Sequence, residues 1–199
     1  MASSTSERAK LLERHEGPCL FDAPAALVKG LLEADIAVPI VAGPRHEPFD
    51  ELLWLAAETG VAELLRRHET TLLRTPNAAR AVTLAVQAAR SGRGALALVP
   101  NAELSESLDA VRRARAEPLP ANASCCLLLE DDPTANVGSC PRTVAAQLDL
   151  PAIEPVSVEE LREAVDTSLR VSRAGRGAIA MIVHRSILRS ACLSPRLCT

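Results

Sequence analysis

The chain has 199 residues with a formal net charge of −3, and 48% of them are hydrophobic but only 2% aromatic. This length suits one domain with an aliphatic core and is too short for two ordinary α/β domains. The chain has no basic stripe to neutralise a phosphate backbone and few rings to stack on bases, so we expect no nucleic-acid binding.

Apolar runs and cysteines indicate the compartment. The longest apolar runs, residues 123–129 and 178–183, have strand length and fall well short of the roughly 20 residues that span a bilayer. Residues 1–16 are polar and contain no apolar signal core. The six cysteines show no Cys-x-x-Cys spacing, so we expect free thiols and no metal site. The sequence therefore predicts a cytoplasmic protein that does not bind membranes.

Helices and strands are predicted to alternate through the first half of the chain, after a flexible polar arm at residues 1–18. In chain order we expect a helix at residues 24–33, a strand at 36–41, helices at 51–59 and 61–67, a strand at 70–74 and a helix at 77–90. Gly60 should separate the second and third helices. Thr75 is predicted to cap the helix at residues 77–90, with Pro76 in its first turn.

The same alternation continues in the second half. We expect a strand at residues 95–99, a helix from 101 to about 116, a strand at 123–129, a short helix at 142–148, a minimal strand at Ile153, a helix at 157–172 and a last strand at 178–183. Ser157, with Glu160 three residues later, should cap the long helix. The tail at residues 190–199 has no clear period, and we expect it to wrap a partner or to be mobile.

This order of elements predicts the fold class and the place of the site. Fully apolar strands between amphipathic helices are typical of a three-layer α/β/α domain with a mostly parallel sheet, here at residues 19–189. In such sheets functional groups gather on the loops at the carboxyl ends of the strands. Those loops are residues 43–49, 74–77, 100–105 and 130–140.

Three local strings carry a resemblance to a known family. Gly30-Leu31-Leu32-Glu33-Ala34 precedes the first predicted strand, Asp131-Asp132-Pro133 follows the fourth, and Glu154-Pro155-Val156-Ser157-Val158-Glu159-Glu160 opens the late helix. In this order the chain resembles the pyrimidine-binding domain of thiamine-diphosphate enzymes, over about residues 22–189. The resemblance is closest to the alpha subunit of indolepyruvate (2-oxoacid) ferredoxin oxidoreductase.

The resemblance implies a subunit that works with a partner. In that family the cofactor lies between two α/β domains, one holding the aminopyrimidine ring and the other holding the diphosphate through Mg²⁺. This chain is similar to the first domain and lacks the Gly-Asp-Gly string of the second. The resemblance therefore implies the pyrimidine-domain subunit of a split 2-oxoacid oxidoreductase or decarboxylase. It would form a homo- or hetero-oligomer in which a diphosphate-domain subunit holds thiamine diphosphate and Mg²⁺.

The resemblance also implies which residues lie beside the cofactor. It places Gly43, Pro44, His46, Asn77, Ala78 and Asn101 there. In the family a glutamate at the start of the helix after the second strand hydrogen-bonds a pyrimidine nitrogen, so that the 4′-amino group can remove the thiazolium C2 proton. This chain has Ala78 at that position, just after Asn77.

Three interpretations of Ala78 follow. In the first, another acid substitutes for the missing glutamate, and Glu103 and Glu69 are the nearest candidates in sequence. In the second, the chain is a catalytically degenerate scaffold or assembly protein. In the third, the alignment is shifted and Glu69, in Arg67-His68-Glu69, is the family glutamate. His68 and Glu69 also fit a solvated helix end.

Overall fold

The core of the protein is a six-stranded parallel sheet. The computed structural model describes residues 2–13, 19–34, 40–43, 45–47, 49–135 and 139–194. The strand order is β3-β2-β4-β5-β7-β6, and every neighbouring pair runs parallel. The strands are β2 (Ile40–Ala42), β3 (Leu72–Arg74), β4 (Gly94–Val99), β5 (Ser124–Asp131), β6 (Ala152–Ile153) and β7 (Ala178–His184). The predicted α/β class with a mostly parallel sheet is confirmed.

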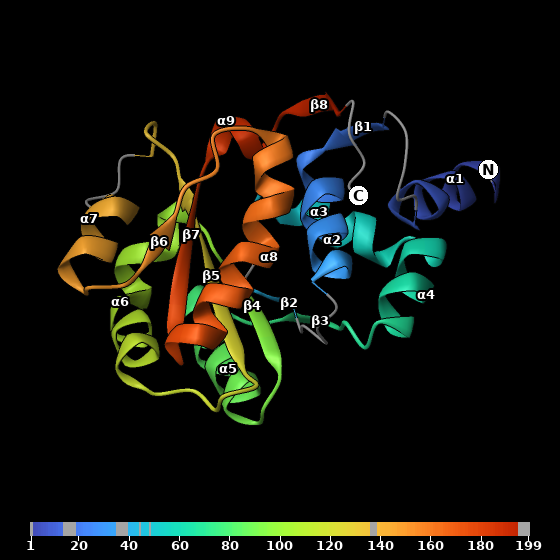
Figure 1. Cartoon of the computed structure of the whole chain (residues 1–199). Coiled ribbons are helices and arrows are strands. Elements are labelled where there is room, and N and C mark those ends of the chain that lie inside the picture. The colour runs from blue at the N-terminus through green and yellow to red at the C-terminus, as the bar shows by residue number, and fades with distance from the viewer. Residues whose placement is uncertain are drawn as a thin grey trace.

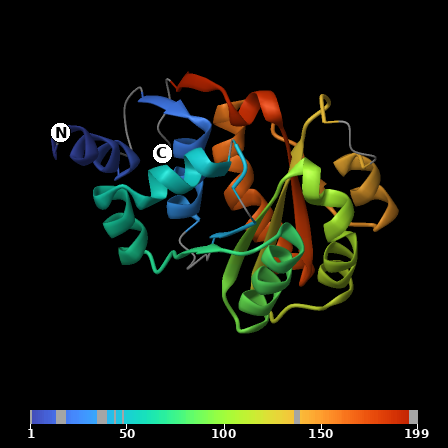
Figure 2. The same cartoon turned by 180° about the vertical axis from the view of Figure 1, so that it is seen from behind.

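Helices cover both faces of this sheet (Figures 1 and 2). One core lies under α2 (Ala23–Glu33), α3 (Phe49–Ala57), α4 (Thr59–Arg67) and α8 (Val158–Gly175). The other lies under α5 (Ala78–Arg90), α6 (Asn101–Ala116) and α7 (Pro141–Gln147). The central strands serve both, because successive side chains of a strand point to opposite faces. Leu96 and Leu98 of β4 join the first core, whereas Ala97 and Val99 join the second.

Two helices on the first face, α2 and α8, approach each other closely at Gly30. A methyl group at this position of α2 would lie 2.5 Å from the carbonyl oxygen of Arg162 and 2.9 Å from Cβ of Val165, both in α8. Glycine at residue 30 therefore lets α2 and α8 pack side by side, as Figure 1 shows. The string that begins at Gly30 thus has a packing reason that the sequence analysis did not identify.

Both ends of the chain contain structure that local sequence did not predict. The expected polar arm includes a helix, α1 (Ala2–Glu13), which is attached where the buried Lys29 ammonium donates to the Leu12 carbonyl oxygen at 2.7 Å. The tail includes β8 (Ala191–Ser194), which pairs antiparallel with β1 (Cys19–Asp22). The sequence did not predict these two strands because each one obtains its hydrogen bonds from the other, and they lie at opposite ends of the chain.

Several predicted boundaries need correction. Thr75 does not cap α5: its hydroxyl donates to the Ala42 carbonyl oxygen, and Asn77 is the cap, accepting from the Arg80 N–H at 2.8 Å. The break between α3 and α4 falls at Glu58, one residue before α4 begins, and not at Gly60.

Other boundaries agree with the sequence or extend it. The Ser157 cap is confirmed, because its hydroxyl accepts from the Glu160 N–H at 3.1 Å. β5 continues to Asp131, so Glu130 belongs to a buried strand. Within the described ranges, no helix combines the length and apolarity needed to cross a membrane.

Candidate functional site

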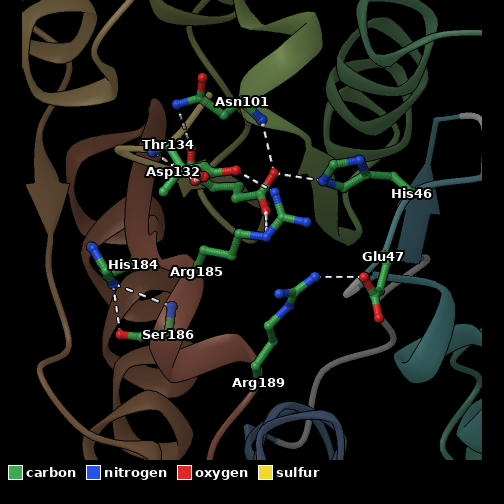
Figure 3. A network of polar contacts seen from close by, with 10 residues as sticks. His46, Glu47, Asn101, Asp132, Thr134, His184, Arg185, Ser186 and Arg189 are labelled. Carbon is green, nitrogen blue, oxygen red and sulfur yellow. Dashed lines mark hydrogen bonds and ion pairs between the residues drawn. The ribbon is translucent and has the colours of Figure 1, made fainter. Parts of the chain in front are cut away.

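The site lies at the edge of the sheet where the strands end. Because all six strands are parallel, the residues that follow each carboxyl end meet at this edge. The carboxylate of Glu130, near the end of the central strand β5, connects them, and Figure 3 shows three of the residues around it, His46, Asn101 and Arg185. The Glu130 side chain has no exposed surface. A charge in such a place requires hydrogen-bond or ionic partners.

Glu130 receives its partners from three other parts of the fold. Its Oε2 atom lies 2.6 Å from Nε2 of His46, in the loop after β2, and 3.1 Å from the backbone N–H of Asn101, which opens α6. The Asn101 side-chain amide donates to the Glu130 backbone carbonyl oxygen at 3.3 Å. Arg185, the first residue of α9 (Arg185–Leu188), places Nε 3.7 Å from Oε1. Glu130 therefore holds a loop and two helix starts together.

The acidic pair after β5 is occupied by neighbouring side chains. Asp132 forms an ion pair with Arg185 and accepts from the Thr134 hydroxyl at 2.6 Å and the Thr134 N–H at 2.9 Å. The Thr134 hydroxyl, and then Arg185, lower the pKa of Asp132 from 3.8 to about 2 against the effect of desolvation. Asp131 pairs with Arg142 at 2.5 Å. Over the described ranges, no group of three or more His, Cys, Asp or Glu residues could hold a metal ion.

A second carboxylate lies beside the start of α5. Glu103, in the first turn of α6, accepts from the backbone N–H of Ala78 at 2.5 Å. Ala78 is the first residue of α5 and is fully buried. The backbone of Gly43 packs against the same point, since a methyl group there would lie 3.1 Å from the Ala78 nitrogen. The positive end of the helix macrodipole favours a carboxylate in this position.

Most of the predicted site residues share this edge. Gly43, His46, Asn77, Ala78, Asn101 and Glu103 all follow the carboxyl ends of β2, β3 or β4. Pro44 lies outside the described residues. Glu69 is exposed, follows the end of α4 and precedes β3, so it lies toward the amino end of that strand. The structure does not bring Glu69 to the other residues.

Sequence reasoning missed Glu130 and Arg185. Glu130 follows six residues that are buried in β5, and a charged residue in such a strand is a signal for a buried partner. Arg185 directly follows β7 and gave no comparable signal.

Among the residues that the structure describes, two buried acceptors at this edge have no hydrogen-bond donor. They are Oε1 of Glu130, which has only the longer contact with Arg185, and Oδ1 of Asn101. Buried polar atoms are paired in most native proteins.

Comparison with solved structures identifies proteins that share this fold. A 2-oxoglutarate:ferredoxin oxidoreductase from Magnetococcus marinus superposes with a TM-score of 0.69 at 13% sequence identity, over 91% of this chain and 32% of that one. A thiamine diphosphate-dependent 4-hydroxybenzoylformate decarboxylase from Rhodococcus jostii RHA1 superposes with a TM-score of 0.60 at 11% identity, over 85% of this chain and 31% of that one. The sequence matches no protein-family model and no curated protein.

These likenesses establish the fold. The chain has an α/β fold that also occurs in these two proteins, an oxidoreductase and a thiamine diphosphate-dependent decarboxylase. It spans about a third of the length of each of the two proteins. Activity, substrate and assembly do not follow from a shared fold, because one fold serves many functions.

Proposed function

We propose that this chain is the pyrimidine-domain subunit of a thiamine-diphosphate-dependent 2-oxoacid oxidoreductase or decarboxylase. A partner subunit carrying the diphosphate domain would complete the active site. The observation that carries the proposal is the 2.5 Å hydrogen bond from the Ala78 N–H to the Glu103 carboxylate.

Through this contact Glu103 would take the place of the glutamate that is missing at residue 78. The family resemblance places the activating glutamate at residue 78, where this chain has alanine. Glu103 brings a carboxylate from α6 to the backbone of that same residue. We therefore favour substitution by Glu103 over substitution by Glu69, which lies toward the amino end of its strand.

The residues at this edge fit the aminopyrimidine end of thiamine diphosphate. Glu103 has a second carboxyl oxygen, Oε1, for which the described residues provide no donor, so it can bind a ring nitrogen. Asn101 has a buried Oδ1 that accepts from none of the described residues, and it would accept from the amino group of the ring if its side chain turned toward the cofactor. When bound, the cofactor supplies a thiazolium carbon whose loss of a proton creates the nucleophile for a 2-oxo acid. Glu103 would hold the proton at the ring nitrogen, and Gly43 would leave room beside it.

The diphosphate end requires other ligands. Mg²⁺ needs hard oxygen ligands together with the phosphates, and the carboxylates of Asp131 and Asp132 are paired with arginines. We propose that a partner subunit holds Mg²⁺ and the diphosphate. That the matched region is about a third of each solved relative supports this division.

Calorimetric titration of thiamine diphosphate and Mg²⁺ tests the proposal. The chain is purified with its native partner, and the cofactor is added to the complex and to the chain alone. We expect saturable binding to the complex and much weaker binding to the chain alone. Glu103→Gln should weaken binding or abolish turnover. Glu106→Gln, on an exposed residue one turn from Glu103 in the same helix, should do neither.

A second candidate, a catalytically degenerate scaffold, is favoured by Ala78 itself. This residue is buried at the start of α5 and carries no acid. The scaffold predicts a stable complex that binds no cofactor, or binds it without turnover in both the native and the Glu103→Gln forms. Gain of turnover only in Ala78→Glu would establish the scaffold and refute substitution by Glu103.

A further inference from the structure

We infer that His46 is an acid–base residue of this site, positioned by Glu130, and that it exchanges a proton with the bound 2-oxo acid. The identity of that substrate rests on the proposed function. The pairing of the two side chains rests on the structure alone. Nothing in the family resemblance assigns a role to Glu130.

The imidazole of His46 is held at one nitrogen and open at the other. Nε2 lies 2.6 Å from Oε2 of Glu130. Among the described residues, none hydrogen-bonds Nδ1, and the side chain is 20% exposed. Nδ1 is therefore the ring nitrogen left for a ligand.

Glu130 fixes which nitrogen carries the proton. An ionised carboxylate only accepts hydrogen bonds, so Nε2 must donate to it, and the lone pair of the neutral ring then lies on Nδ1. Oε2 also accepts from the Asn101 N–H at 3.1 Å, which keeps the carboxylate in place. A buried carboxylate that orients a histidine in this way is a recurrent arrangement in catalytic sites.

Two further contacts help to hold the loop that contains His46 in position. The imidazole packs at a tilt of 56° on the ring of Phe49, with centroids 5.8 Å apart. The adjacent residue, Glu47, pairs with Arg189 at 2.5 Å, just beyond α9. His46 is therefore not an unattached loop histidine exposed to solvent.

The proton passes between Nδ1 and the oxygen of the 2-oxo group. Nδ1 of the ring, protonated from water, donates a proton to the carbonyl oxygen of the bound 2-oxo acid as that oxygen becomes a hydroxyl. The positive charge that the ring carries before this transfer lies against the Glu130 side chain. Nδ1 takes the proton back when the hydroxyl becomes a carbonyl again in the product, so the proton transfer itself needs no further reactant.

The test begins with the full chain by itself. Nitrogen-15 NMR of the four histidines, with His46→Gln for assignment, reports the tautomer of His46. We expect the Nε2–H form to predominate in His46. A free-imidazole mixture at His46 would overturn the inference without bearing on the proposed function.

The second part uses the complex with its partner, thiamine diphosphate and Mg²⁺, with pyruvate, 2-oxoglutarate and indolepyruvate as substrates. His46→Gln keeps an amide donor for Glu130 but cannot exchange a proton. It should lower kcat about 100-fold. Glu130→Gln should lower kcat about 10-fold, and the double variant should be no slower than His46→Gln, because the two act as one unit.

The outcomes separate this inference from the proposed function. If the complex binds cofactor and needs Glu103, yet His46→Gln keeps kcat within about threefold, the acid–base role is refuted and the proposed function stands. If the two single effects multiply in the double variant, Glu130 does not act through His46. If the native complex binds no cofactor, both proposals fail.

Discussion

Replacing Glu130 by alanine tests how strongly the carboxyl edge depends on one side chain. The variant leaves the buried Asn101 N–H without its acceptor, at a cost of about 1–3 kcal/mol. Removing one member of a buried ion pair typically costs about 3–5 kcal/mol. Arg185 keeps Asp132, and the partly exposed His46 can reach water, so the loss should be smaller. We expect a decrease of about 2–4 kcal/mol in the free energy of unfolding.

Urea unfolding followed by circular dichroism measures this loss against a matched control. Glu154 is also a carboxylate at this edge and pairs with Arg142 at 2.7 Å, but its side chain is 39% exposed. Glu154→Ala should therefore cost less than about 1 kcal/mol. The slope of the free energy of unfolding against urea concentration should be the same in both variants as in the native protein. A Glu130→Ala protein as stable as Glu154→Ala would refute the view that the buried carboxylate holds the edge together.

Three further predictions concern packing, acid stability and thiol reactivity. Gly30→Ala should lower the free energy of unfolding by about 1–3 kcal/mol in urea, because its methyl group would meet the backbone of α8, whereas Gly175→Ala, with nothing within 4 Å, should be neutral or stabilising; equal effects would contradict the close crossing. The folded pKa of Asp132, about 2, lies below its ordinary 3.8, so the unfolded chain binds the proton first and stability should fall between about pH 4 and pH 2. Acid titration of Asp132→Asn should lack that part of the loss, and an unchanged profile would contradict the assignment. Iodoacetamide followed by peptide mass spectrometry should label Cys140, whose pKa is lowered mainly by the Thr143 N–H, and spare Cys126, where burial raises the thiol pKa to about 12; labelling of Cys126 in the native protein would contradict its burial.

Local sequence was sufficient to predict the architecture. The strands β4, β5 and β7 are apolar throughout most of their length because both faces of the sheet are covered, and this pattern is visible without coordinates. The Ser157 cap was predicted because all its members lie within four residues. The loops at the carboxyl ends of the strands were expected at one edge, and the parallel sheet places them there.

The site itself depends on contacts that sequence spacing does not encode. His46 and Glu130 are 84 residues apart, and Ala78 and Glu103 are 25 apart. Which carboxylate reaches which backbone amide is decided by the packing of α5, α6 and β5. The choice between Glu103 and Glu69 was open in the sequence for that reason. The orientation of β3 leaves Glu69 toward the amino end of that strand, whereas the packing of α6 against α5 places Glu103 beside Ala78.

Proton exchange at C2 of thiamine diphosphate is the most direct test of the central claim that Glu103 replaces the missing glutamate. The native complex is mixed with deuterium oxide, quenched in acid, and the remaining C2 proton is measured by NMR. We expect rapid exchange in the native complex and in Glu69→Gln, and a loss of about 100-fold or more in Glu103→Gln. Rapid exchange in Glu103→Gln, or its loss in Glu69→Gln, would contradict the role of Glu103.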